Sequence, residues 1–129
     1  MALRLGVGGR AIQDVLVVPA RRERSEAVTS HRGNRYGTTV RFYDQTRQTW
    51  RIVWVNPVSG AVNSLTARRE GDAIVQEGTD SDGTLIRWSF VEIDRNRFHW
   101  VGERSMDAGR TWQTRAEFFG RRASFAQLR

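Results

Sequence analysis

The stretch TLIRWSFVEIDRNRFHWVGERSMDAGRTWQTRAEFF, Thr84–Phe119, carries the clearest fold signal of this chain. Within it, apolar and polar residues alternate in segments that are separated by turn-forming clusters such as DRN and MDAG. Alternation with a period of two is typical of β-strands whose two faces differ in polarity. Because the connections are short, neighbouring strands must run antiparallel. The stretch therefore predicts an antiparallel meander.

The same pattern extends over most of the chain and predicts about eight strands joined by short turns. The expected strands are Arg10–Val18, Arg35–Tyr43, Thr49–Val55, Ala61–Arg69, Asp72–Thr79, Thr84–Ile93, Arg97–Ser105 and Arg110–Arg122. None of the intervening sequence has the apolar stripe of a long amphipathic helix. A sheet without helical cover buries its apolar face by closing on itself. The sequence therefore predicts an all-β fold, an up-and-down antiparallel β-barrel.

The expected organisation is a single barrel domain over residues 1–129. Residues 1–9, which include the glycine-rich GVGG, are expected to form a flexible N-terminal arm. Residues 19–34 are polar and lack an apolar stripe, so they are expected to form a loop or at most a short helix.

The alternation also predicts which side chains face the barrel interior. One face of each of the later strands is rich in aromatic residues, and all five tryptophans of the chain fall on such faces. Trp112 is expected on the same face of its strand as Phe118. The opposite faces suit water and cross-strand ion pairs. Their polar residues are Arg51, Arg87, His99, Glu103, Arg115 and Glu117.

The segment SMDAGRTW, Ser105–Trp112, resembles the aspartate-box hairpin S-x-D-x-G-x-T-W of sialidases and other β-propellers. A propeller needs at least about four blades of four strands each, which 129 residues cannot supply. We interpret the motif as a hairpin. Ser105 is expected to hydrogen-bond across its base, Gly109 to adopt a positive φ, and Trp112 to pack back onto the preceding strand.

Composition narrows the possible partners. The formal net charge is +7, yet all 21 basic residues are Arg and are spread along the chain, whereas nucleic-acid-binding proteins generally also use Lys. We therefore do not expect a nucleic-acid partner. The absence of cysteine excludes disulfides and fits a reducing compartment. No apolar run is long enough for a membrane span, and the N-terminus is a poor signal peptide. The expectation is a cytoplasmic protein without membrane contact.

The interior of the predicted barrel is the candidate binding site. A barrel of this size encloses either a packed core or one small ligand, and the sequence leaves both open. A pocket would need apolar walls, polar groups that orient the ligand and a group at the rim for an anionic end. These predicted ligand-binding residues are Trp54, Trp88 and Trp100 as walls, Asn63 and Gln76 as orienting groups, and Arg41 and Tyr43 at the rim.

Catalytic chemistry is an alternative with weaker support. Asp14 and Glu103 are candidate carboxylates for acid–base catalysis, and His31 or His99 is a candidate at the barrel mouth. His31 would also be the better placed of the two histidines to bind haem, if its loop folds over the barrel. The chain has no spacing typical of a metal site and no G-x-S-x-G nucleophile motif. We therefore assign no catalytic residue, metal or cofactor.

The succession YGTTVRFYD, TWRIVWVNPVSG, GDAIVQEGTDSDG, IRWSFVEI and FHWVGERSMDAGRTW resembles a bacterial lipocalin-like, calycin-type family of unknown function. The resemblance covers roughly residues 9–122 and implies a calycin-like β-barrel that holds a small hydrophobic ligand. It implies no catalytic residues. The lipocalin signature G-x-W is missing near the first strand, where GGRAIQDV stands instead. A missing first strand would leave an open edge, which makes a homodimer plausible.

Three hypotheses follow, in order of preference. The first is a β-barrel that binds a small apolar or amphipathic molecule. The second is a small enzyme, a hydrolase or isomerase that uses a carboxylate or histidine at the barrel mouth. The third is a homodimeric interaction module that works through an open sheet edge or an arginine-rich face.

Overall fold

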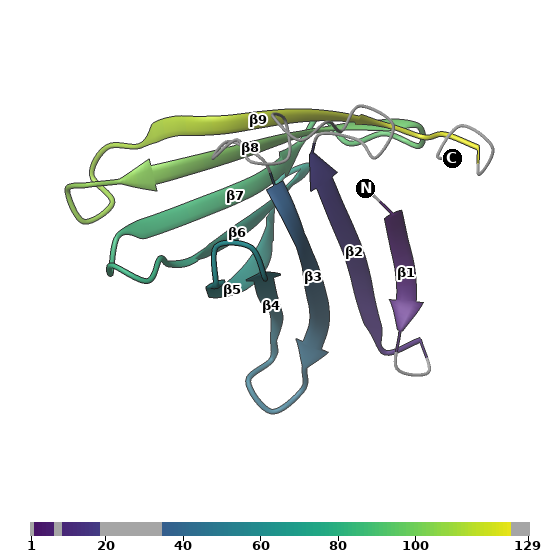
Figure 1. Ribbon diagram of the computed structural model, residues 1–129, viewed down its shortest axis with the longest axis horizontal. Helices are drawn as coiled ribbons and strands as arrows, with labels where there is room; N and C mark the ends of the chain where they lie inside the picture. The colour runs from purple at the N-terminus through teal and green to yellow at the C-terminus, as the bar shows by residue number, and fades with distance from the viewer. Residues whose placement is uncertain (1, 7–8, 19–34, 125–129) are drawn as a thin grey trace. The chain divides into compact units, whose positions relative to one another are not determined.

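The computed structural model describes residues 2–6, 9–18 and 35–124, and in this part of the chain all regular secondary structure is β-strand (Figure 1). The strands are β1 (Ala2–Gly6), β2 (Ala11–Val18), β3 (Arg35–Asp44), β4 (Thr49–Asn56), β5 (Ala61–Glu70), β6 (Ala73–Thr79), β7 (Leu85–Val91), β8 (Arg97–Ser105) and β9 (Gln113–Arg121). No helix in the described ranges has the length and apolar character needed to cross a membrane. The loop or short helix expected at residues 19–34 lies outside the described residues.

The strands lie in the sheet in the same order as in the sequence, from β1 to β9. Pairing is antiparallel between β1 and β2, β2 and β3, β3 and β4, β6 and β7, β7 and β8, and β8 and β9. This is the strand order of an up-and-down β-barrel. The predicted all-β, up-and-down antiparallel fold class is confirmed.

The chain divides into two compact units, Met1–Leu65 and Thr66–Arg129, whose boundary falls inside β5. In the first unit, Ile52 and Leu65 are fully buried side chains. In the second unit, Val75 and Ile86 are the buried apolar side chains. The single barrel domain over residues 1–129 stays a prediction.

The N-terminal segment differs from the flexible arm expected for residues 1–9. Ala2–Gly6 forms β1, which pairs with β2 in a register that sets Ala2 opposite Val15 and Gly6 opposite Ala11. Backbone pairing explains the difference, because β2 offers β1 a complete row of donors and acceptors and thereby gains cover for its own edge.

An irregularity between β8 and β9 overturns one of the predicted faces. The register shifts at Gly102 and Glu103, so that Ala116 lies opposite Gly102 but Thr114 lies opposite Glu103. A β-bulge of this kind inserts one extra residue and reverses the side-chain alternation beyond it. Trp112 consequently lies against Arg87, with the guanidinium carbon 4.0 Å from the ring centroid. The prediction that Trp112 shares a face with Phe118 is wrong.

In the hairpin that joins β8 to β9, Ser105 and Gly109 take the roles that the aspartate box predicts. The Ser105 hydroxyl donates to Asp107 Oδ1 at 2.9 Å and accepts from the Gly109 N–H at 2.8 Å. The Thr111 N–H and hydroxyl both donate to the Asp107 carboxylate. Gly109 has a φ of 88°, where an L side chain is disfavoured. These contacts stabilise the turn, and the role of the motif here is structural.

Candidate functional site

Aromatic side chains cover one face of β7, β8 and β9 in the second unit. They come from alternate positions and are Trp88, Phe90, Phe98, Trp100 and Phe118, all half-buried. Ring centroids lie 6.0 Å apart for Trp88 and Trp100, 5.2 Å for Trp100 and Phe118, and 5.3 Å for Phe90 and Phe98. The rings meet at tilted or edge-on angles, the favourable arrangement for aromatic pairs. We call these side chains the aromatic face.

Glycines lie beneath two of these rings. A Cβ atom on Gly102 would lie 2.6 Å from Cη2 of Trp100, and one on Gly120 would overlap the ring of Phe98. Any side chain at either position would therefore push the ring away from the sheet. Glycine in a strand interior often marks such a close approach. The two rings can lie low on the backbone because both positions lack a side chain.

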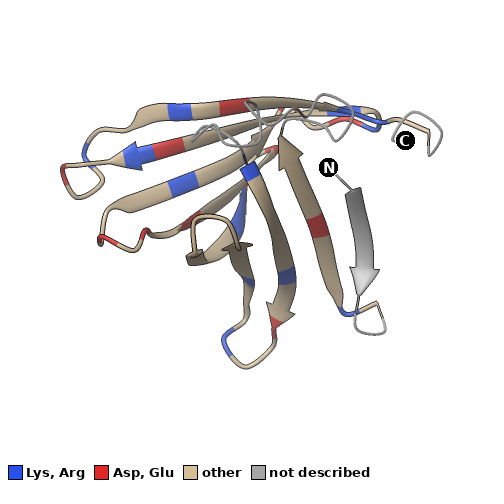
Figure 2. Cartoon of the chain, viewed as in Figure 1, with Lys and Arg blue, Asp and Glu red and all other residues tan. Residues whose placement is uncertain are grey.

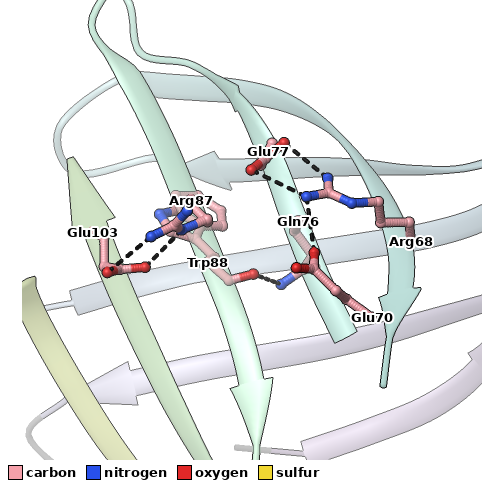
Figure 3. Close-up of polar contacts among 7 residues, drawn as sticks. All are labelled: Arg68, Glu70, Gln76, Glu77, Arg87, Trp88 and Glu103. Atoms are coloured by element: carbon pink, nitrogen blue, oxygen red, sulfur yellow. Dashed lines mark hydrogen bonds and ion pairs between the residues drawn. The ribbon is translucent and has the colours of Figure 1, made fainter. Parts of the chain in front are cut away.

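Gln76 on β6 borders the aromatic face opposite Trp88. Its side chain has no exposed surface, and its amide nitrogen donates to the backbone oxygen of Trp88 at 3.2 Å (Figure 3). A buried amide needs such partners, because an unpaired one costs free energy. Gln76 therefore lies opposite one predicted wall residue, Trp88, and hydrogen-bonds to its carbonyl oxygen.

One charged cluster stands at the end of the aromatic face. Arg104 lies opposite Ile86 in the β7–β8 register, and its Nη2 is 3.1 Å from Asp82 Oδ2 and 3.5 Å from Asp80 Oδ2. The hydrogen bond from Thr84 and the nearby Arg104 guanidinium hold the pKa of Asp82 below its usual value. Asp82 therefore stays ionised at neutral pH, and the cluster marks a polar border to an otherwise apolar surface.

The opposite face of the same strands carries a row of alternating charges. Arg87 makes two hydrogen bonds to the Glu103 carboxylate at 2.8 and 3.2 Å, and Arg68 on β5 bridges Glu70 and Glu77 (Figure 3). The bond to Glu103 raises the pKa of Arg87 above its ordinary value. Glu103, a candidate catalytic carboxylate, is thus the bidentate partner of an arginine on the face away from the aromatic rings.

In the first unit, Arg41 forms an ion pair with Asp14 across β2 and β3. The Asp14 side chain is 4% exposed and that of Arg41 is 17% exposed. Two charges removed from water at this depth need one another, since removing one partner leaves a costly buried charge. This ion pair bears on two predicted roles. Arg41, expected to hold an anionic group of a ligand, is paired with a carboxylate of the chain itself. Asp14, a candidate catalytic carboxylate, accepts from that guanidinium.

The other predicted residues of the first unit lie on β3, β4 and β5. Trp54 rests on Gly37 as Trp100 does on Gly102, because a Cβ on Gly37 would overlap the indole. Tyr43 is exposed and meets Trp50 edge-on at 5.8 Å. Asn63 is a buried polar side chain on β5. Trp54, Arg41, Tyr43 and Asn63 therefore belong to the first unit, while Trp88, Trp100 and Gln76 belong to the second.

Of the two candidate histidines, only His99 lies in the described part of the chain. His99 lies on the charged face, where Nε2 is 2.7 Å from Glu117 Oε2 and the ring stacks on Phe119 at 4.2 Å. His31 lies outside the described residues, so the haem hypothesis is untested there. Among the residues the structure describes, no group of three or more His, Asp or Glu side chains gathers at metal-binding distance.

Sequence reasoning missed the contacts between rings and glycines. A signal was present, because Gly37, Gly102 and Gly120 each interrupt a segment of strand-forming residues. Glycine weakens a strand unless another group packs on it. Which ring covers which glycine depends on register, however, and an alternation pattern does not fix register.

Comparisons with known proteins found no match for this chain among protein-family models, curated proteins or solved structures.

Proposed function

We propose that this protein binds a small apolar or amphipathic molecule on the aromatic face, within a barrel of the lipocalin-like, calycin type. The strand-and-turn succession and the up-and-down order support the family resemblance. The aromatic rings would supply the apolar surface, and the Asp80–Arg104–Asp82 cluster at its end would meet a polar group of the ligand. Ligand sites commonly combine an apolar lining with a few polar groups.

The observation that carries this proposal is the seating of Trp100 and Phe98 on glycines. The two rings fill the space over positions 102 and 120, where a Cβ atom would overlap them. Glycine at these positions therefore lets the rings lie close to the backbone. The rings of the aromatic face stay half-buried rather than fully covered, which would leave part of their surface to a ligand.

The test is a titration followed by tryptophan fluorescence, with two probes of different shape. One probe is 8-anilinonaphthalene-1-sulfonate, which is aromatic, and the other is dodecanoate, which is aliphatic. We expect saturable binding of at least one. We expect Trp100→Leu to weaken that binding by about tenfold, which corresponds to about 1.4 kcal/mol and is comparable to the contribution of one stacked ring.

The matched control is Trp112→Leu, which removes the same side chain from the opposite face. It should leave probe affinity unchanged, because Trp112 packs on Arg87. Near-ultraviolet circular dichroism of each variant must stay native, since partly unfolded proteins also bind the anilinonaphthalene probe. Equal weakening by both tryptophan variants, or no saturable binding of either probe by the wild type, would overturn the proposal.

A further inference from the structure

The last strand of the sheet carries features that its neighbour β8 does not account for. β9 ends the strand order and pairs with β8, so among the described strands its outer edge presents unpaired backbone groups. Phe119 on β9 stacks on His99 of β8 and is nevertheless 75% exposed, the highest value for a large apolar side chain in the described part of the chain. Acidic and basic residues both occur along this strand (Figure 2).

Arg121 is placed against a charge of the same sign. It lies directly opposite Arg97 on β8, and like charges in that position destabilise a strand pair. Arg97 has Asp94 as its partner at 2.9 Å. Arg121 has no hydrogen-bond or ion-pair partner within the described residues. Its exposed guanidinium is therefore available to an acidic group that approaches the outer edge of β9.

We infer that β9 pairs with β9 of a second copy of this chain, antiparallel and with the two-fold axis at Phe119. Alternation places Glu117, Phe119 and Arg121 on the same face. In this register Phe119 meets Phe119 of the second copy. Glu117 meets Arg121 of the second copy, and by symmetry the reverse pair forms as well. Each Arg121 thereby gains the acidic neighbour that it does not have among the described residues of its own chain.

The charge pattern selects this register over its neighbours. With the axis one residue earlier, at Phe118, Arg115 would face Arg121 of the second copy. With the axis at Glu117, that carboxylate would face its own symmetry mate. With the axis at Gly120, Phe119 would face Arg121. Opposite charges directly across strands stabilise the pair and like charges destabilise it, so the two-fold at Phe119 is preferred.

The dimer should be weak and dependent on concentration. One pair of edge strands buries less surface than a standard protein interface, and its affinity comes from backbone hydrogen bonds, one aromatic pair and two exposed ion pairs. The Glu117 carboxylate is 45% exposed and already lies beside His99, so it can accept from both groups.

Sedimentation velocity from about 10 μM to 1 mM tests the inference, in the range where weak dimers form. We expect the wild type to show a reversible monomer–dimer equilibrium. Glu117→Arg and Arg121→Glu should each weaken association by at least about tenfold, because each sets like charges opposite one another. The double variant Glu117→Arg/Arg121→Glu restores opposite charges and should recover affinity to within about threefold of the wild type.

Two measurements separate lost association from lost folding. Arg115→Glu makes the same charge change on β9 at a position that faces no charge in the proposed register, and it should not weaken the dimer. Arg121→Glu should keep or raise the thermal stability of the monomer, because it replaces the like-charge pair with Arg97 by an opposite pair. A wild type that stays monomeric throughout would overturn the inference. So would single variants that associate normally, or a double variant that does not recover.

The ligand proposal and this inference fail separately. The aromatic face and the side chains of Glu117, Phe119 and Arg121 lie on opposite faces of the sheet. Probe binding therefore tests the ligand proposal, and sedimentation tests the dimer.

Discussion

The two faces of β7–β9 are made of alternate residues of the same strands, yet they are organised by different interactions. On the aromatic face, rings contact one another at tilted angles and rest on glycines. On the charged face, long side chains form ion pairs across strands, as Arg87 does with Glu103 and His99 with Glu117. Shape sets the positions on the first face, and charge pairing sets them on the second.

The difference implies different vulnerabilities. Tilted rings that lie low on the backbone tolerate changes of charge nearby but not added volume beneath them. Ion pairs tolerate changes of volume in solvent but respond to neutralisation, salt and pH. Substitutions on each face therefore test whether the aromatic face depends on shape and the charged face on charge.

The largest effect is expected from added volume under the aromatic face. Gly102→Val should lower the free energy of unfolding by about 1–3 kcal/mol, because its side chain would occupy the place of the Trp100 ring. The displaced indole should also change the tryptophan emission spectrum. Urea unfolding followed by circular dichroism and fluorescence provides both measurements.

Ala116→Val is the comparison for this variant, since it adds methyl groups directly opposite Gly102 where a Cβ already fits. It should cost less than about 1.5 kcal/mol. If the two substitutions cost the same, the ring does not depend on the glycine, and the proposed seating of Trp100 is wrong.

The strand pattern alone predicted the antiparallel order and most of the aromatic face. Trp88, Phe90, Phe98 and Trp100 sit at positions of one parity in regular strands, and period-two alternation places such residues reliably. Gly109 was predicted to take a positive φ because the turn chemistry is local. Trp112 was misplaced, because one extra residue in a β-bulge leaves no mark in the alternation of residue types.

The candidate site was less predictable than the fold. Gln76 was expected only as a polar group that orients a ligand, and its hydrogen bond to the backbone oxygen of Trp88 depends on the β6–β7 register. The ion pair between Asp14 and Arg41 joins residues 27 positions apart, and the intervening sequence says nothing about their alignment. Contacts across strands require register, and register is set by packing and turn length together.

A smaller effect is expected from neutralising the charged face. Glu103→Gln should destabilise the fold by about 1 kcal/mol, because it weakens the bidentate bond to a partly buried arginine. The loss should shrink at high salt. Glu70→Gln is the matched control, as its carboxylate is 62% exposed and its pair with Arg68 should contribute less than about 0.5 kcal/mol. Equal losses in urea unfolding would show that burial does not strengthen the Arg87–Glu103 pair.

The smallest effect is expected at the hairpin that joins the two strands, and it should appear only in acid. Hydrogen bonds from Thr111 hold the pKa of Asp107 down to about 2, well below the usual range of an aspartate. A carboxyl with a lowered pKa stabilises the folded state above the unfolded value and loses that contribution as pH falls through the folded value. The stabilisation by Asp107 should therefore be complete above about pH 4 and disappear toward pH 2.

Asp107→Asn isolates this charge, because the amide oxygen can still accept from the Thr111 N–H while it cannot ionise. The variant should unfold at a lower temperature than the wild type at pH 6, and the difference should narrow as pH falls from about 4 to 2. Asp72→Asn, at a fully exposed side chain, should give no such narrowing. A difference that stays constant with pH would mean that the hairpin depends on the shape of Asp107 rather than on its charge. The turn would then belong with the shape-determined aromatic face.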